Sequence, residues 1–170
     1  LMSRTAATTD ITGQMILLGT GTSVGVPVLG CDCEVCTGGN PKNSRTRCAA
    51  ILGLPGGNLL IDTPPDLRTQ LLREGIGIVH AVLYTHEHAD HLFGLDDLRL
   101  MQFYLDGPVP LYCEPKVAQR IRHSYDYAFQ ADEPTHKGAR PRLTLENIST
   151  EPFTVLGERI IPIRLEHGPH

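Results

Sequence analysis

Residues 85–91 read THEHADH, and these three histidines and two acids directly follow an apolar run. Neutral imidazole nitrogens and carboxylate oxygens are both ligands of divalent transition metals. In a tight loop at a strand end, side chains two residues apart point the same way, so His86 and His88 can bind one ion. Asp90 and His91 then face a neighbouring position that suits a second ion. The loop therefore predicts a hydrolase site for two divalent metal ions. The histidine spacing is not that of a helical zinc protease. The alternative is a chance cluster of histidines in a polar loop.

Short apolar runs and segments of helical periodicity alternate along the chain. The runs predict strands at residues 14–18, 48–54, 58–62, 79–84, 109–113, 143–145 and 160–165, and the periodic segments predict helices at 67–72, 95–104 and 115–125. Strands alternating with helices predict an α/β layered fold whose functional residues gather at strand ends. Residues 1–13 are small and polar and predict a flexible tail ahead of one domain, residues 14–170.

Composition narrows the class of protein. A length of 170 residues suits one domain, and a formal charge of −4 argues against a broad nucleic-acid surface, which would need many lysines and arginines. The sequence has no apolar run of about 20 residues, and its start lacks the basic and apolar segments of a signal peptide. We therefore expect a soluble cytoplasmic protein that does not enter a membrane.

The cysteines form a second candidate site. Cys31, Cys33 and Cys36 are spaced so that their thiolates can converge on one structural zinc ion, which needs a fourth ligand. The alternative is a loop of reduced, inert cysteines, since five cysteines without a secretion signal argue against a disulfide framework. Cys48 could complete the zinc site, although its place at the head of an apolar strand favours a buried thiol. Cys113 is expected in the core.

Other residues near strand ends have simpler interpretations. Asp62 closes a predicted strand, and it either orients a metal-binding histidine or caps the strand end. Asp66 is expected to be a helix N-terminal acid. His167 follows an apolar run as His86 does, so we expect it to reach the same site as a metal ligand, the alternative being a solvated histidine.

These motifs together resemble a known family. Residues 85–91 are similar to the histidine-aspartate signature of the metallo-β-lactamase superfamily, and the segments 19–23, 31–36 and 94–99 resemble its PhnP-type phosphodiesterase branch. That branch is related to the tRNA 3′-end-processing endonucleases. The resemblance implies a metallo-β-lactamase αββα sandwich. Family members continue for about another third of a chain, so we expect a C-terminally incomplete version of the fold.

The resemblance also implies a ligand set for two divalent ions, zinc or manganese. His86, His88 and His167 would bind the first ion, and Asp90 and His91 the second. Asp90 would also act in catalysis by orienting the nucleophile. The family supplies a bridging aspartate, a further histidine, the leaving-group acid and the fourth ligand of the cysteine site from a C-terminal part that has no counterpart in this sequence.

The predicted activity is hydrolysis of a small phosphate diester, cyclic diesters included, with charge balanced by basic residues of the loop 128–142. Lactones, thioesters or β-lactams are alternative substrates for the same metal site. A non-catalytic binding protein similar to the PQQ-biosynthesis protein PqqB is an alternative from another class. Enzymes of this branch are often dimers, so the resemblance also implies a homodimer. Nucleic acid is not an expected partner.

Overall fold

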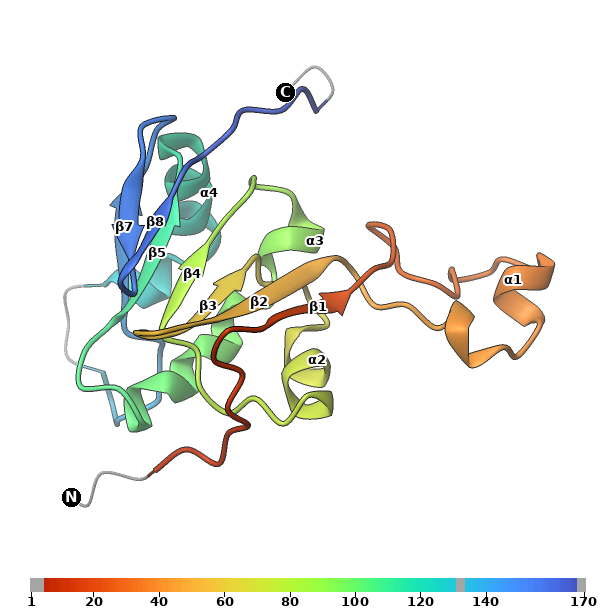
Figure 1. Ribbon diagram of the computed structural model, residues 1–170, viewed down its shortest axis with the longest axis horizontal. Coiled ribbons are helices and arrows are strands. Elements are labelled where there is room, and N and C mark those ends of the chain that lie inside the picture. Colours follow the sequence, from red (N-terminus) through yellow and green to blue (C-terminus); the bar gives the residue numbers. More distant parts are fainter. Residues whose placement is uncertain (1–4, 131–133, 168–170) are drawn as a thin grey trace.

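A six-stranded mixed sheet organises the part of the chain that the computed structural model describes, residues 5–130 and 134–167 (Figure 1). Its strands lie in chain order, antiparallel from β1 to β3 and parallel from β3 to β6. They are β1 (Met15–Gly19), β2 (Ala49–Leu54), β3 (Gly57–Ile61), β4 (Ala81–Leu83), β5 (Val109–Cys113) and β6 (Leu143–Asn147). A separate hairpin pairs β7 (Phe153–Val155) with β8 (Glu158–Ile160). The predicted α/β class is confirmed.

Helices cover one face of this sheet. They are α2 (Leu67–Arg73), α3 (Ala89–Leu92), α4 (Pro115–Ser124) and the 3-10 helices η2 (Leu95–Phe103) and η3 (Asp126–Phe129), while α1 (Glu34–Thr37) and η1 (Pro41–Asn43) lie elsewhere. Leu60, Val82 and Leu111 are cross-strand neighbours and fully buried against this layer. Each such side chain stabilises the fold by about 1.5–3 kcal/mol. The burial fixes which residues of each strand face the helices.

The β7–β8 hairpin packs on the opposite face. Leu59 and Ala81 are buried against Val155, and the Tyr112 and Phe153 rings stack with centroids 5.3 Å apart. This gives the described part of the chain a layer on each side of the sheet.

The segment between β1 and β2 extends away from the sheet and carries α1 (Figure 1). It begins at Gly19, where a Cβ atom would lie 1.9 Å from the Arg47 carbonyl oxygen. Glycine is therefore required for the two ends of this projecting segment to approach each other.

The parallel arrangement of β3 to β6 positions the candidate site. Carboxyl ends of parallel strands meet at one edge of a sheet, so Asp62, the loop 85–91, Glu114 and Ile148 follow four neighbouring strands at that edge. Across residues 5–130 and 134–167, no helix is both long and apolar enough to cross a bilayer.

The predicted strand at one end of the domain is wrong, and part of the predicted tail at the other end is packed. Within the predicted flexible tail 1–13, Ile11 is 2% exposed and Thr12 bridges Gly53, whereas residues 7–10 are exposed; residues 1–4 lie outside the described range. The predicted strand 160–165 ends at Ile160, and Leu165 is 80% exposed. That segment has strand-like alternation of side chains but no partner strand among the described residues.

Candidate active site

The histidine loop leaves the carboxyl end of β4 and enters α3, whose N-cap residue is His88. Beside it, Nε2 of His86 lies 3.1 Å from Nδ1 of His88. Four ligand atoms arranged tetrahedrally at zinc–nitrogen distances of about 2.0–2.1 Å lie about 3.3 Å apart. The pair is therefore spaced like two ligands of one cation.

His167 reaches the same place from a segment far away in sequence. One ligand atom each of His86, His88 and His167 lies within 4.8 Å of the other two. The ring centroids of His86 and His167 are 4.9 Å apart. Three imidazoles from two segments therefore converge, and this set of nitrogen donors fits a divalent transition metal.

Asp62 holds the loop from beneath. It is buried, and its carboxylate accepts hydrogen bonds from the backbone N–H and hydroxyl of Thr85 at 2.8 and 2.7 Å. Its Oδ2 also lies 2.7 Å from Nδ1 of His91. Of its two predicted roles, the contacts favour orientation of a histidine, because an Nδ1–H held by a carboxylate leaves Nε2 to face a cation.

Asp90 and His91 form the other half of the loop. Nε2 of His91 lies 3.3 Å from Oδ2 of Asp90, and the His91 and His86 rings are 4.1 Å apart between centroids. Within the described ranges, the groups of three or more donors close enough for one ion are the histidine triad and the cysteine cluster. Asp90 and His91 thus supply a two-donor position beside the triad.

Local electrostatics differ between these histidines. Burial lowers the pKa of His86, and the neighbouring His91 and His88 lower it further, so its ring favours the neutral form that binds metal. The hydrogen bond to Asp62 raises the pKa of His91 despite partial burial. A cation at Nε2 of His91 would have to displace a proton that Asp62 stabilises.

The cysteine cluster lies on the projecting segment. Sγ atoms of Cys31 and Cys33 are 3.4 Å apart, and a sulfur atom of Cys36 lies within 4.8 Å of both. A hydrogen bond from the Cys36 backbone N–H lowers the pKa of Cys33 to about 7, which favours the thiolate. Three converging sulfur donors suit a soft divalent ion such as zinc.

Cys48 does not belong to this cluster. Its thiol is exposed, so the expectation of a buried thiol is wrong. It is also absent from the group formed by Cys31, Cys33 and Cys36. Partial loss of solvent raises its pKa, as do the negative charges of Asp62 and Asp90. Cys48 therefore lies near the histidine loop, a position that its sequence context did not predict. Cys113 is fully buried, as expected.

Several charged contacts near the site were not predicted. Glu87, between the two histidines, pairs with Lys116 at 2.5 Å, and Glu114, at the end of β5, pairs with Arg164 at 2.9 Å. Asp66 is the N-cap residue of α2 but makes no side-chain capping bond, and instead pairs with Arg47 at 3.1 Å. Sequence spacing gives no signal for pairs that lie 29 or 50 residues apart.

Comparisons with known proteins agree with this geometry. A family model described as a β-lactamase superfamily domain matches residues 57–170. An octanoyltransferase of Porphyromonas gingivalis is 40% identical over 157 residues, covering 91% of this chain and 31% of that protein. Coenzyme PQQ synthesis protein B of Methylorubrum populi is 32% identical over 122 residues, covering 64% of this chain and 39% of that protein.

Solved structures give the same result. The crystal structure of a diphosphatase from the PhnP family superposes with a TM-score of 0.81 at 36% identity, covering 92% of this chain and 58% of that one. Zinc-bound PqqB from Methylobacterium extorquens superposes with a TM-score of 0.64 at 25% identity, covering 82% and 50%. The chain thus spans less than two thirds of each of these relatives. With its histidine loop at the carboxyl edge of the sheet, the chain belongs to the metallo-β-lactamase superfamily.

Proposed function

We propose that this chain carries the metal centre of a hydrolase whose preferred substrate is a small phosphate diester. The observation that carries the proposal is the convergence of His86, His88 and His167 from two segments beside His91, which Asp62 orients. The similarity to a PhnP-family diphosphatase supports phosphate chemistry, because water attacks phosphorus and a P–O bond breaks both in a diphosphate and in a phosphate diester.

In this proposal the histidine triad holds one divalent ion, and Asp90 and His91 hold a second, zinc or manganese. Ions bound there supply Lewis acidity, which lowers the pKa of a water molecule towards neutrality and offsets the negative charge of the phosphate. Asp90 accepts a hydrogen bond from the attacking water and orients it. Asp62 keeps the His91 ring in one orientation through its bond to Nδ1.

A substrate panel tests the reaction class. The full chain loaded with zinc or manganese is expected to hydrolyse bis(p-nitrophenyl) phosphate and to leave a chromogenic β-lactam intact. His86→Ala is expected to abolish this turnover, whereas His123→Ala, an exposed histidine on α4, is the matched control and should not change it. Equal loss in both variants, or turnover of the β-lactam alone, would exclude the proposal.

A PqqB-like binding function is the second candidate. It is favoured by the PQQ synthesis protein B relatives, such as that of Methylobacterium sp. strain 4-46 at 30% identity over 91% of this chain. Zinc uptake at the triad without hydrolysis of any ester or diphosphate in the panel would support this candidate over the hydrolase.

We also propose that the cysteine cluster binds one structural zinc ion. The three sulfur atoms and the lowered pKa of Cys33 support it. Metal analysis of the full chain is expected to find zinc that remains bound when His86→Ala removes one ligand of the histidine triad.

A further inference from the structure

The hydroxyl group of Thr85 joins two parts of the histidine cluster. Thr85 lies just after β4 and directly before His86. Its Oγ1 is 2.7 Å from Oδ2 of Asp62 on one side and 2.9 Å from Nδ1 of His86 on the other. The same Oδ2 is 2.7 Å from Nδ1 of His91. One buried carboxylate therefore contacts His91 directly and is linked to His86 through a hydroxyl group.

The number of available hydrogens fixes the direction of each bond. A hydroxyl group donates one hydrogen and can also accept, whereas an ionised carboxylate only accepts. The hydroxyl hydrogen of Thr85 therefore points to Asp62, and its oxygen can bond to His86 only by accepting from an Nδ1–H. Because a neutral imidazole carries a single N–H, Nε2 of His86 is left with an unprotonated lone pair.

The opposite direction of the Thr85 hydroxyl is less favourable. If it donated to Nδ1 of His86, its oxygen and Oδ2 of Asp62 would lie 2.7 Å apart with no hydrogen between them. Hydrogen bonds to an ionised acceptor are also about twice as strong as those between neutral groups. Asp62 is 3% exposed, so little water is available to replace the hydroxyl as a donor. The carboxylate therefore takes the hydroxyl hydrogen.

The unprotonated nitrogen of His86 is the one that faces its neighbour in the triad. Nε2 of His86 lies 3.1 Å from Nδ1 of His88. A proton on Nε2 would occupy the lone pair that a cation needs, whereas a proton held on Nδ1 leaves that lone pair available. The tautomer that the Thr85 contact favours is thus the one that suits an ion bound by the triad.

We propose that Thr85 is a positioning residue of the metal centre, which holds the His86 proton on Nδ1 and keeps Nε2 available to the cation. The inference rests on the proposed function and deepens it. Asp62 then orients one ligand of each ion, His91 by a direct bond and His86 through Thr85. Without the hydroxyl this restraint is lost, and in water a histidine side chain favours the proton on Nε2.

Two substitutions separate the hydroxyl group from the rest of the Thr85 side chain. Thr85→Val replaces the hydroxyl with a methyl group of similar size, and Thr85→Ser keeps the hydroxyl. Thr85 is exposed and lies outside the buried core, so both variants should fold. A role of the hydroxyl predicts that serine preserves what valine loses.

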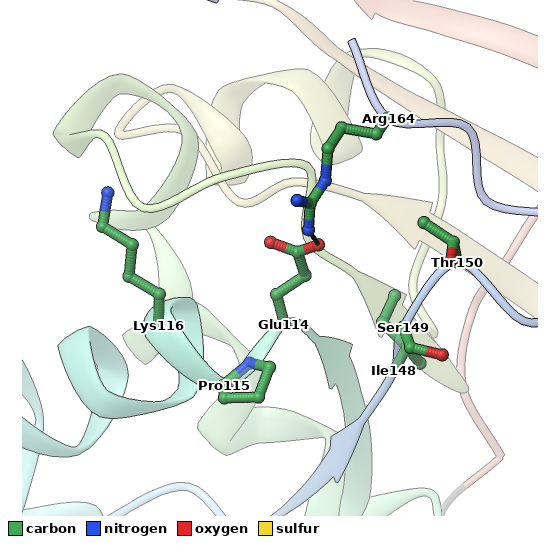
Figure 2. A pocket seen from close by; sticks show the side chains of 7 residues that line it. All are labelled: Glu114, Pro115, Lys116, Ile148, Ser149, Thr150 and Arg164. Atoms are coloured by element: carbon green, nitrogen blue, oxygen red, sulfur yellow. Dashed lines mark hydrogen bonds and ion pairs between the residues drawn. The ribbon is translucent and has the colours of Figure 1, made fainter. Parts of the chain in front are cut away.

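Two other threonines receive the same change to valine as matched controls. Thr46→Val removes a hydroxyl that donates to the Leu18 carbonyl oxygen at 3.2 Å, so it tests the loss of a partly buried hydrogen bond alone. Thr150→Val alters an exposed threonine in the groove that Figure 2 shows. That groove lies beyond the carboxyl ends of β5 and β6, at the same sheet edge as the histidine loop.

Nitrogen NMR of labelled histidine measures the tautomer and the zinc affinity at the same ring. Spectra of the full chain are recorded at about pH 8, where neutral imidazole dominates, and the His86 signals are those absent from His86→Gln. Before zinc is added, we expect the His86 proton on Nδ1 in wild type and a shift towards Nε2 in Thr85→Val. A zinc titration against a competing chelator, followed at these signals, should show an affinity about 10- to 100-fold lower in Thr85→Val. Thr85→Ser, Thr46→Val and Thr150→Val should match wild type in both measurements.

Several results would overturn the proposal. They are a His86 proton on Nε2 in metal-free wild type, an unchanged proton position or zinc affinity in Thr85→Val, and a loss in Thr85→Ser or Thr46→Val as large as that in Thr85→Val. Absence of hydrolysis together with the expected tautomer shift and loss of affinity would reject the proposed function and leave the role of Thr85 standing. Hydrolysis with an unshifted tautomer in Thr85→Val would do the reverse.

Discussion

Asp62→Asn separates two roles of one buried carboxylate, stabilising the loop and orienting His91. Asp62 is 3% exposed and accepts bonds of 2.8 and 2.7 Å from Thr85, besides its 2.7 Å contact with His91. Asparagine has nearly the same shape, and it tolerates the left-handed φ of 62° found here. The substitution therefore removes a charge and turns one acceptor into a donor without creating a cavity.

The two roles should respond differently. Oδ1 of the new amide can still accept from the Thr85 N–H, and the Thr85 hydroxyl can rotate to accept from the amide. We therefore expect the free energy of unfolding to fall by only about 1–2 kcal/mol. His91 can adapt only by moving its proton to Nε2, and a protonated Nε2 cannot bind a cation. Loss of such a carboxylate partner lowers metal affinity about 10- to 100-fold.

Three measurements check this reasoning. Competition with a chromogenic chelator gives zinc affinity, urea denaturation gives stability, and nitrogen NMR of labelled histidine reports the tautomer of His91. Asp66→Asn is the matched control, since its carboxylate pairs with Arg47 rather than with a histidine. Wild-type zinc affinity in Asp62→Asn, with the His91 proton moved to Nε2, would refute the assigned role of Asp62.

Three further predictions concern stability and the second metal site. Burial lowers the pKa of His80, and its Nδ1 accepts a hydrogen bond from the Asn58 N–H at 2.9 Å. The unfolded chain therefore takes up a proton at His80 more readily than the folded chain does. The stabilisation by the neutral His80 ring is complete above a pH of about 6.5 and is lost as the pH falls below that value. His80→Asn keeps an acceptor in place, and its urea midpoint should fall less than that of wild type between pH 7.5 and 5.5; equal losses would contradict the assignment. Cys33→Ser should remove one zinc ion per chain by mass spectrometry while zinc at the histidines is retained, and an unchanged zinc count would exclude the cysteine site. Ile121→Ala should cost about 2–5 kcal/mol of unfolding free energy, because that side chain is fully buried, whereas Ile161→Ala, at a residue that is 59% exposed, should cost far less.

The sheet could be predicted because its strands are short apolar runs bounded by glycine and proline. The predicted strand 109–113 coincides with β5, and Pro115 opens α4 as expected. His167 was also predicted to meet the histidine loop, and its ring does lie beside that of His86, although the run before it forms no strand beyond Ile160. The strands therefore follow from local patterns, whereas the position of His167 depends on the tertiary course of the chain.

The packing of Ile11 against the sheet could not be recognised from the residues around it. Ile11 is a lone apolar residue in a polar stretch, and its burial depends on close approach to Gly53, where a Cβ atom would lie 1.9 Å from the Ile11 carbonyl oxygen. A glycine inside an otherwise apolar strand is the signal that was available, since it marks a place where another backbone comes close.

The failures around the site have a common cause. Residues 160–165 alternate like a strand, but a strand forms only where a partner offers hydrogen bonds, and β8 ends at Ile160. The pairing of Arg164 with Glu114 depends on that same tertiary course of the chain. Long-range ion pairs and unpaired segments leave no periodicity in a sequence, so neither was predictable.

His167 joins the histidine loop through residues 161–166, so the order of that segment should depend on whether a cation is bound at the histidines. Residues 161–166 form no strand, and Ile163 and Leu165 are 79% and 80% exposed, so little packing restrains them. A cation shared by His167 and the β4 loop would fasten this stretch to the sheet. Trypsin should then cleave after Arg164 readily in a chelator and slowly in zinc, which makes the proteolytic pattern a direct gauge of occupancy at the histidines.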